Sequence, residues 1–107
     1  GLTEHVTIHG TKKKKTLTAR IDTGATKSSI DSHLAIELEL GPEKRKTIVK
    51  SAHGIKLRPV IHEAVEIAGR FIDAEFTVAD RSHMKYKVLI GQNILKKGFL
   101  IDPNKAE

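Results

Sequence analysis

The segment ARIDTGATKSSI, residues 19–30, contains residue types that could do chemistry: a lone carboxylate followed by a turn of small residues. Asp22 ends an alternating apolar run, and Thr23 and Gly24 follow it directly. Gly24 allows the backbone to turn tightly, so that amide N–H groups can fix the carboxylate, and the Thr23 hydroxyl is placed to brace the turn. The alternative is a capping or turn carboxylate, because Asp is common before glycine in turns.

A carboxylate in this setting suits an aspartic peptidase. Hydrolysis without a metal or a nucleophilic side chain needs one group that deprotonates water and another that protonates the carbonyl oxygen. Two carboxylates sharing one proton do both, because like charges about 3 Å apart cannot both ionise. The sequence holds a single Asp-Thr-Gly, so a dyad requires a symmetric homodimer. We therefore expect Asp22, Thr23 and Gly24 to form half of a catalytic site.

Two arginines are candidate contacts for an acidic substrate. Arg20 lies two residues before Asp22 on the same face of the expected strand, and Arg58 lies in an expected hairpin. A guanidinium can hold a carboxylate through two hydrogen bonds. The alternative, that each is an ordinary surface arginine, stays open.

Charge restricts the partners of this chain rather than its fold. The formal net charge is +6, and basic runs occupy residues 12–15 and 44–46. Such runs favour an acidic peptide or a nucleic acid as ligand, or they are solvated turns. Three Phe and one Tyr, none of them among the basic residues, provide no stacking surface for bases. We therefore expect a peptide or protein partner rather than a nucleic acid.

Length and composition predict one domain over residues 1–107. No apolar run approaches the roughly 18 residues of a membrane span, and the first ten residues lack the pattern of a signal peptide. The absence of cysteine excludes disulfides, thiolate catalysis and cysteine-based zinc sites. We expect a cytoplasmic protein with no membrane partner.

Two pairs of histidines are the candidate metal ligands of this sequence. His5 and His9 are four residues apart on an expected strand, and His53 and His62 flank an expected hairpin. Neither pair has HExxH or another known ligand spacing. We expect ordinary surface histidines, no metal site and no cofactor.

The elements that must position Asp22 are mostly strands. Alternation and turn residues predict strands over 5–10, 15–22, 46–51, 55–61, 63–69, 70–80, 87–90 and 99–102, with hairpin turns at His53-Gly54 and Gly69. Residues 30–40 fit a strand or a helix, and we favour a short helix capped by Asp31 and ended by Gly41-Pro42. Residues 91–98 predict a second short helix. The expected fold class is mostly β with one or two short helices.

The segments ARIDTGA and KVLIGQN share a pattern, because each ends an apolar strand with a small turn before a helical segment. The pattern indicates two related halves around a common centre.

Four segments together resemble a known family: ARIDTGATKSS, GIKLRPVI, FTVADRSHMKYKVLIGQNIL and GFLIDP, within about residues 17–103. In this order they are similar to the retropepsin-type aspartic protease fold. They also resemble the bacterial and archaeal family labelled ATP-dependent zinc proteases, found alongside glutamate-adding ATP-grasp ligases of the ribosomal S6 modification type. The resemblance implies a closed retropepsin-like acid-protease barrel, a homodimer and a flap over residues 51–59. It adds Ala25 and Gly54, the latter near the flap tip, to the expected substrate contacts.

Two positions depart from the retroviral members of this fold. Those usually carry an acidic residue four positions after the catalytic Asp and an Arg directly after the later Gly, and the two pair near the dimer interface. Thr26 and Gln92 stand at the matching positions. Both partners are absent together, so no charge is left unpaired, and the dimer must be held in another way.

The expected function is an aspartic-type endopeptidase that works as a homodimer on acidic or oligo-glutamate peptides, with a functional link to an ATP-grasp ligase. The first alternative is a catalytically inactive peptide-binding module of the same fold. The second is a zinc-dependent peptidase, although the chain lacks recognised zinc spacings and a glycine-rich phosphate loop of P-loop type.

Overall fold

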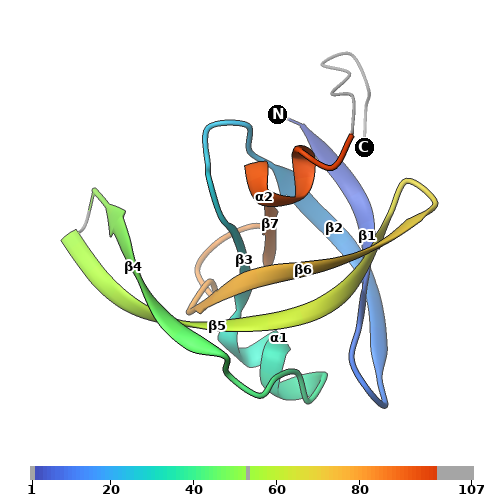
Figure 1. Cartoon of the computed structure of the whole chain (residues 1–107), viewed down its shortest axis with the longest axis horizontal. Helices are drawn as coiled ribbons and strands as arrows, with labels where there is room; N and C mark the ends of the chain where they lie inside the picture. Colours follow the sequence, from blue (N-terminus) through green and yellow to red (C-terminus); the bar gives the residue numbers. More distant parts are fainter. Residues whose placement is uncertain (1, 53, 99–107) are drawn as a thin grey trace.

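A curved, seven-stranded sheet and two short helices make up the described part of the chain, residues 2–52 and 54–98 of the computed structural model (Figure 1). The strands are β1 (Thr3–His9), β2 (Lys14–Ile21), β3 (Ser28–Asp31), β4 (Arg45–Ser51), β5 (Gly54–Ile67), β6 (Arg70–Ala79) and β7 (Val88–Ile90). The helices are α1 (Ser32–Glu37) and α2 (Gln92–Leu95). The strand expected over residues 99–102 lies outside the described residues.

The sheet closes on itself. The strand order is β1-β2-β7-β3-β6-β5-β4, and a further antiparallel pairing joins β1 to β5. The six strands from β1 to β5 in this order therefore form a barrel, which leaves few unpaired strand edges. Among the described strands β4 pairs only with β5, and their hairpin projects from the barrel (Figure 1). The mostly β class and the closed barrel are confirmed.

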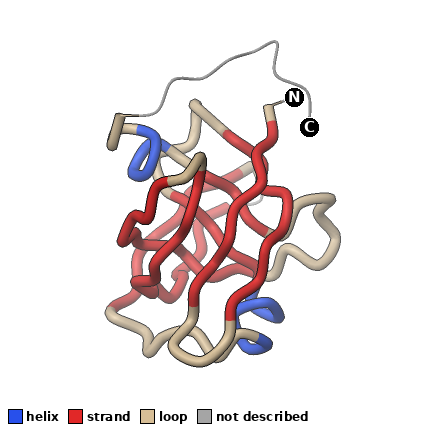
Figure 2. Tube along the Cα trace, turned by 90° about the vertical axis from the view of Figure 1, so that its right-hand side faces the viewer, coloured by secondary structure: helices blue, strands red, loops and turns tan. Residues whose placement is uncertain are grey.

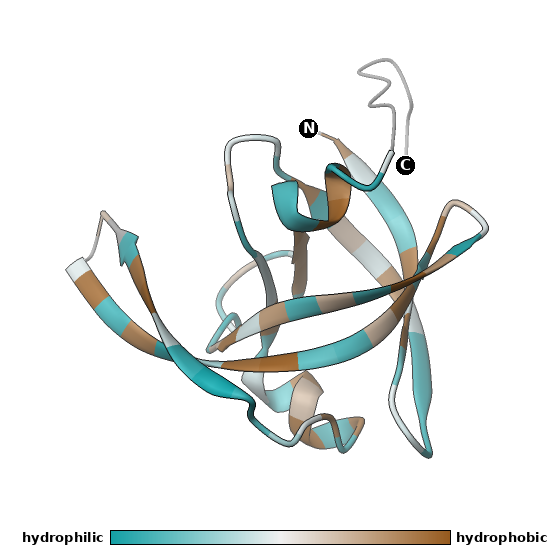
Figure 3. Cartoon of the chain, viewed as in Figure 1, coloured by the Kyte–Doolittle hydropathy of each residue, from teal (hydrophilic) through white to brown (hydrophobic). Residues whose placement is uncertain are grey.

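Apolar and polar residues alternate along the barrel strands (Figure 3), so one set of side chains points into the barrel. Val6, Ile8, Ala19 and Phe76 are at most 1% exposed there. The two helices close opposite ends of the barrel (Figure 2). Leu34 of α1 and the apolar residues of α2 join the same core.

The helix expected over residues 30–40 is shorter than predicted. Ser28–Asp31 instead form β3, which pairs parallel with β6 and antiparallel with β7. Asp31 caps α1 as expected, because its Oδ2 accepts the N–H groups of His33 and Leu34 at 3.2 and 3.3 Å. The helix ends at Glu37 rather than at Gly41-Pro42, and Glu39 turns the chain with a φ of 54°.

The strands expected over 55–61 and 63–69 form one continuous strand. The first half of β5 pairs with β4, while its second half pairs with β6 and β1. Only His62 separates the two predicted strands, and the pairing changes from β4 to β6 at Val60, so the chain continues from one pairing into the other without a turn. The expected turn at Gly69 is present, and Ala68 and Gly69 have φ values of 52° and 77°, as a two-residue hairpin turn requires.

Within the described residues, α1 has six residues and α2 has four, and no helix is long and apolar enough to cross a membrane.

Candidate active site

Asp22 lies directly after β2, half-buried, in a turn that fixes its carboxylate. Its N–H donates to the carbonyl of Ile90 at 2.9 Å, which ties the end of β2 to the end of β7. The N–H of Gly24 donates to Asp22 Oδ1 at 2.9 Å, and the N–H of Ala25 donates to the Asp22 carbonyl at 3.2 Å. Within the described residues Oδ2 accepts no hydrogen bond, so one carboxylate oxygen is available to a second chain or to water.

The segment before α2 braces this turn. The Gln92 N–H donates to the Ala25 carbonyl at 2.8 Å, and the Gln92 side-chain amide donates to the Thr23 carbonyl at 2.7 Å. The Asn93 N–H donates to the Thr26 carbonyl at 3.2 Å. Gln92, which stands where retroviral members carry Arg, therefore holds the Asp22 turn within its own protomer.

Gly91 allows the two segments to approach this closely. A Cβ added there would lie 2.3 Å from the Lys27 carbonyl oxygen and 2.9 Å from that of Ala25. Such distances are far below van der Waals contact, and both obstacles are backbone atoms. Any larger residue would therefore push the Asp22 turn away from β7.

Ser28 connects the same segments through a buried hydroxyl. Its Oγ donates to Asn93 Oδ1 at 2.7 Å and accepts the N–H of Gly91 at 3.0 Å. The Asn93 amide in turn donates to the Glu75 carbonyl at 2.9 Å. Ser28 is fully buried, and through Asn93 this network joins β3, β6 and α2. Nothing in the residue types of Ser28 and Asn93 had indicated that these two residues would support the Asp22 turn.

The two segments with the shared sequence pattern lie side by side. β2 and β7 are parallel neighbours, with Arg20 beside Leu89 and Ile21 beside Ile90. A helix follows β7 directly, but after the Asp22 turn β3 comes first and α1 only then. The expectation of a helical segment after each turn is correct only for the second one.

The predicted site residues gather mainly in one turn. Asp22, Thr23, Gly24 and Ala25 form it, and the Thr23 hydroxyl makes no hydrogen bond among the described residues. The expectation that this hydroxyl braces the turn is therefore not met inside the protomer, where the Thr23 carbonyl does so instead.

Arg20 is exposed and lies near a second arginine. Ala19, its neighbour on β2, points into the core, so the Arg20 side chain points outward. Burial lowers the pKa of Arg81, the charge of Asp31 raises it, and the charge of Arg20 lowers it again. The positive charges of Arg20 and Arg81 therefore repel each other, which adds to the effect of burial on the pKa of Arg81.

Arg58 and Gly54 belong to the projecting β4–β5 hairpin. Gly54 begins β5 beside the end of the hairpin with a φ of 110°. Arg58 pairs with Thr47 across the hairpin, and Ile48 pairs with Leu57. Cross-strand partners share a face, and Thr47 lines a pocket with Lys27. Arg58 is therefore on the face turned toward the segment after Asp22.

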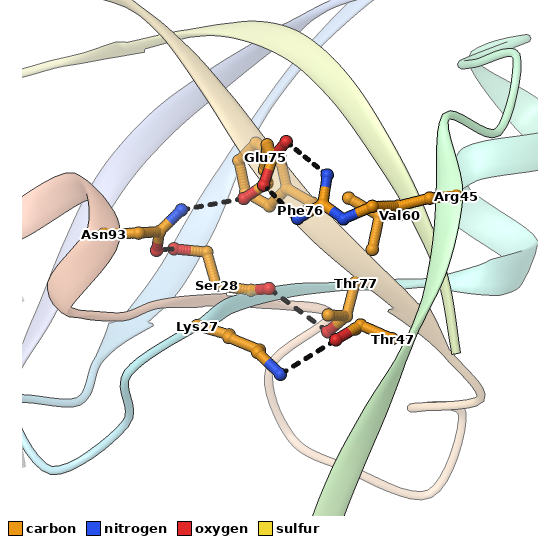
Figure 4. A pocket seen from close by; sticks show the side chains of 9 residues that line it. All are labelled: Lys27, Ser28, Arg45, Thr47, Val60, Glu75, Phe76, Thr77 and Asn93. Carbon is orange, nitrogen blue, oxygen red and sulfur yellow. Dashed lines mark hydrogen bonds and ion pairs between the residues drawn. The ribbon is translucent and has the colours of Figure 1, made fainter. Parts of the chain in front are cut away.

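That pocket lies between the end of the Asp22 segment and the hairpin (Figure 4). It holds about 300 Å³, including its open mouth, and is lined by Lys27, Ser28, Arg45, Thr47, Val60, Glu75, Phe76, Thr77 and Asn93. Lys27 was not predicted as a site residue. Its position five residues after Asp22, within the quoted motif, was the signal that could have identified it.

One group of potential metal ligands occurs among the described residues: Asp31, His33 and Asp80, whose ligand atoms lie within 4.8 Å of one another. Asp31 is at the opposite end of β3 from the Asp22 turn, and its oxygens already accept three backbone N–H groups, including that of Arg81 at 2.7 Å. Neither predicted histidine pair contributes, and His53 lies outside the described residues. This group does not fit a catalytic metal for Asp22.

A family model described as "Retropepsin-like aspartic endopeptidase RimB" matches residues 34–107. A protein named "Probable alpha-L-glutamate ligase" from Shewanella halifaxensis (strain HAW-EB4) is 28% identical over 113 residues, covering 82% of this chain and 25% of that protein. The chain therefore spans about a quarter of the length of that relative.

Solved structures agree on the fold. The EIAV protease complexed with the inhibitor HBY-793 is similar with a TM-score of 0.72 and 24% identity, over 90% of this chain and 86% of that one. The Simian Foamy Virus (mac) protease is similar with a TM-score of 0.64 and 22% identity, over 92% of this chain and 100% of that one. At these identities the similarity concerns the fold alone.

Proposed function

This chain belongs to the RimB-like family of retropepsin-like aspartic endopeptidases, and on that premise we propose that it hydrolyses peptide bonds as a homodimer. The observation that carries the proposal is the Asp22 turn, in which Gly24 N–H fixes one carboxylate oxygen at 2.9 Å and leaves the other available. The family match starts at residue 34, so the role of Asp22 rests on this geometry.

In the proposed dimer the Asp22 residues of the two protomers share one proton. The ionised carboxylate takes a proton from a water whose oxygen attacks the substrate carbonyl carbon, and the protonated one gives its proton to the carbonyl oxygen. The tetrahedral intermediate then collapses as the carbon–nitrogen bond breaks: the leaving nitrogen takes a proton from the dyad, and a hydroxyl of the intermediate returns one proton to it. The Gly24 N–H and the Gln92 bracing keep each carboxylate oriented throughout.

An acidic peptide is the substrate that the charges favour. Arg20 lies two residues from Asp22, Arg58 lies on the inner face of the hairpin, and the chain carries a net charge of +6. A relative is named as an alpha-L-glutamate ligase, and a ligase of that kind forms bonds to glutamate. We therefore propose oligo-glutamate segments as substrates, a functional link to such a ligase and a cytoplasmic location.

Replacement of the proposed catalytic carboxylate tests the mechanism. Asp22→Asn removes the charge and the shared proton while it keeps the size of the side chain. We expect kcat for oligo-glutamate peptides to fall by roughly a thousandfold or more, with an unchanged circular dichroism spectrum. Asp73→Asn, at an exposed position on β6, is the matched control and should retain activity.

Two results would contradict this mechanism. Hydrolysis that survives Asp22→Asn but is lost with a chelator would identify a zinc-dependent peptidase. Tight binding of oligo-glutamate peptides by the wild type, with no cleavage from acid to neutral pH, would identify a peptide-binding module.

A further inference from the structure

Lys27 joins the Asp22 segment to the projecting hairpin through neutral groups. Its Nζ donates to Thr47 Oγ1 at 3.2 Å (Figure 4), and it also donates to the Ile48 carbonyl at 3.1 Å. Within residues 2–52 and 54–98 it forms no ion pair with a carboxylate. Since an ammonium group has three donors, one N–H of Lys27 is still available, and its charge is uncompensated.

The other charged groups of the pocket neutralise each other. Arg45 donates to both carboxylate oxygens of Glu75, at 2.6 and 2.8 Å. The Arg45 hydrogen bonds lower the pKa of Glu75, so this carboxylate stays ionised and paired near neutral pH. Among the described residues that line this pocket, Lys27 is therefore the cation that remains to attract an anion.

The rest of the lining offers no second charge. Ser28, Thr77 and Asn93 already bond among themselves, since Ser28 donates to Asn93 and Thr77 donates to the Ser28 carbonyl. Val60 and Phe76 lie at the back of the pocket and are almost fully buried, at 2% and 0% exposed. A substrate side chain with a terminal carboxylate would therefore be held by its charge at Lys27.

We propose that Lys27 selects a glutamate side chain of the substrate, and that the pocket between the Asp22 segment and the β4–β5 hairpin is the subsite that receives it. This inference rests on the proposed peptidase function and adds the residue that reads the side chain. The ammonium group would donate its remaining N–H to the substrate carboxylate, and charge-assisted hydrogen bonds are the stronger kind.

A substrate series with single substitutions tests the assignment. Oligo-glutamate peptides, each with one Glu replaced by Gln at successive positions around the scissile bond, are cleaved by wild type and by Lys27→Met, which keeps the length of the stem. In the wild type we expect kcat/KM to fall about tenfold at one position. In Lys27→Met that drop should disappear, while the effects at other positions remain.

Lys50→Met is the matched control, because it removes the same charge from the same hairpin. Lys50 lies on the same face of β4 as Ile48, opposite Thr47, so the Lys50→Met variant should keep the full drop at the position that Lys27 recognises. Lys27→Glu should reverse the preference there, in favour of Gln or Lys. An equal loss for every peptide in Lys27→Met would overturn the inference, since Lys27 would then only hold the segment to the hairpin.

Binding separates this inference from the proposed function. If the wild type cleaves none of the peptides, the peptidase proposal fails, but calorimetric titration of Asp22→Asn with the same series still reports on Lys27. If Asp22→Asn binds the all-Glu peptide more tightly than one of the Gln peptides, and the double variant with Asp22→Asn and Lys27→Met does not, the result would support the subsite. Equal affinity for all of the peptides in Asp22→Asn would overturn it.

Discussion

Asp31 is a buried carboxylate held by backbone N–H groups, with 3% of its surface exposed. Burial by itself would raise the pKa of Asp31, but hydrogen bonds from Arg81, Leu34 and His33 hold it below the ordinary 3.8. A lowered folded-state pKa means that the ionised group stabilises the fold above about pH 4, and that this contribution is lost as the pH falls through the folded-state pKa.

Asp31→Asn should therefore lower the free energy of unfolding at pH 7 by about 1–3 kcal/mol. The difference from the wild type should narrow as the pH falls below about 4, as measured by urea denaturation at one protein concentration. Asp73→Asn, whose side chain is exposed, should show little difference at any pH. If the difference in free energy of unfolding between Asp31→Asn and the wild type stayed the same at every pH, the charge of Asp31 would not be the cause of the stabilisation.

At the scale of the secondary-structure elements, the buried Ser28 hydroxyl connects β3 to α2 and to the residue before it, through hydrogen bonds with Asn93 and Gly91. Ser28→Ala would leave the Gly91 N–H and Asn93 Oδ1 without this partner, which should cost about 1–3 kcal/mol of stability and lower peptidase activity. Ser29→Ala, the next residue on the other face of β3, should change the free energy of unfolding by less than about 0.5 kcal/mol. Equal effects of the two variants would show that the network does not support the turn.

As a whole molecule, the protomer presents half of the proposed dyad. The Gln92 side-chain amide is used inside the protomer, and Thr26 carries no charge, so the ion pair expected of retroviral dimers is not available. We therefore expect specific activity to rise with protein concentration. Added Asp22→Asn should reduce wild-type activity by forming mixed dimers, whereas added Asp73→Asn should not.

Sedimentation at the same concentrations would give the fraction of dimer independently. Specific activity that does not depend on concentration, and that excess Asp22→Asn does not reduce, would show that one protomer is enough and would exclude the shared dyad.

Local patterns were sufficient for features that neighbours in sequence decide. The strand before Asp22, the cap at Asp31 and the turn at Gly69 depend on residues within a few positions, and each was predicted correctly. β3 was missed because four residues show no clear period, and its pairing with β6 and β7 comes from distant segments.

By itself, then, the sequence determined the Asp-Thr-Gly turn at the end of a strand and the mostly β class. Only the tertiary structure decided what surrounds that turn, because Ser28 and Asn93 are 65 residues apart and Lys27 and Thr47 are 20 apart in the chain. The tertiary fold brings these pairs into hydrogen-bonding distance, and a period read along one segment contains no information about which distant segment will lie beside it.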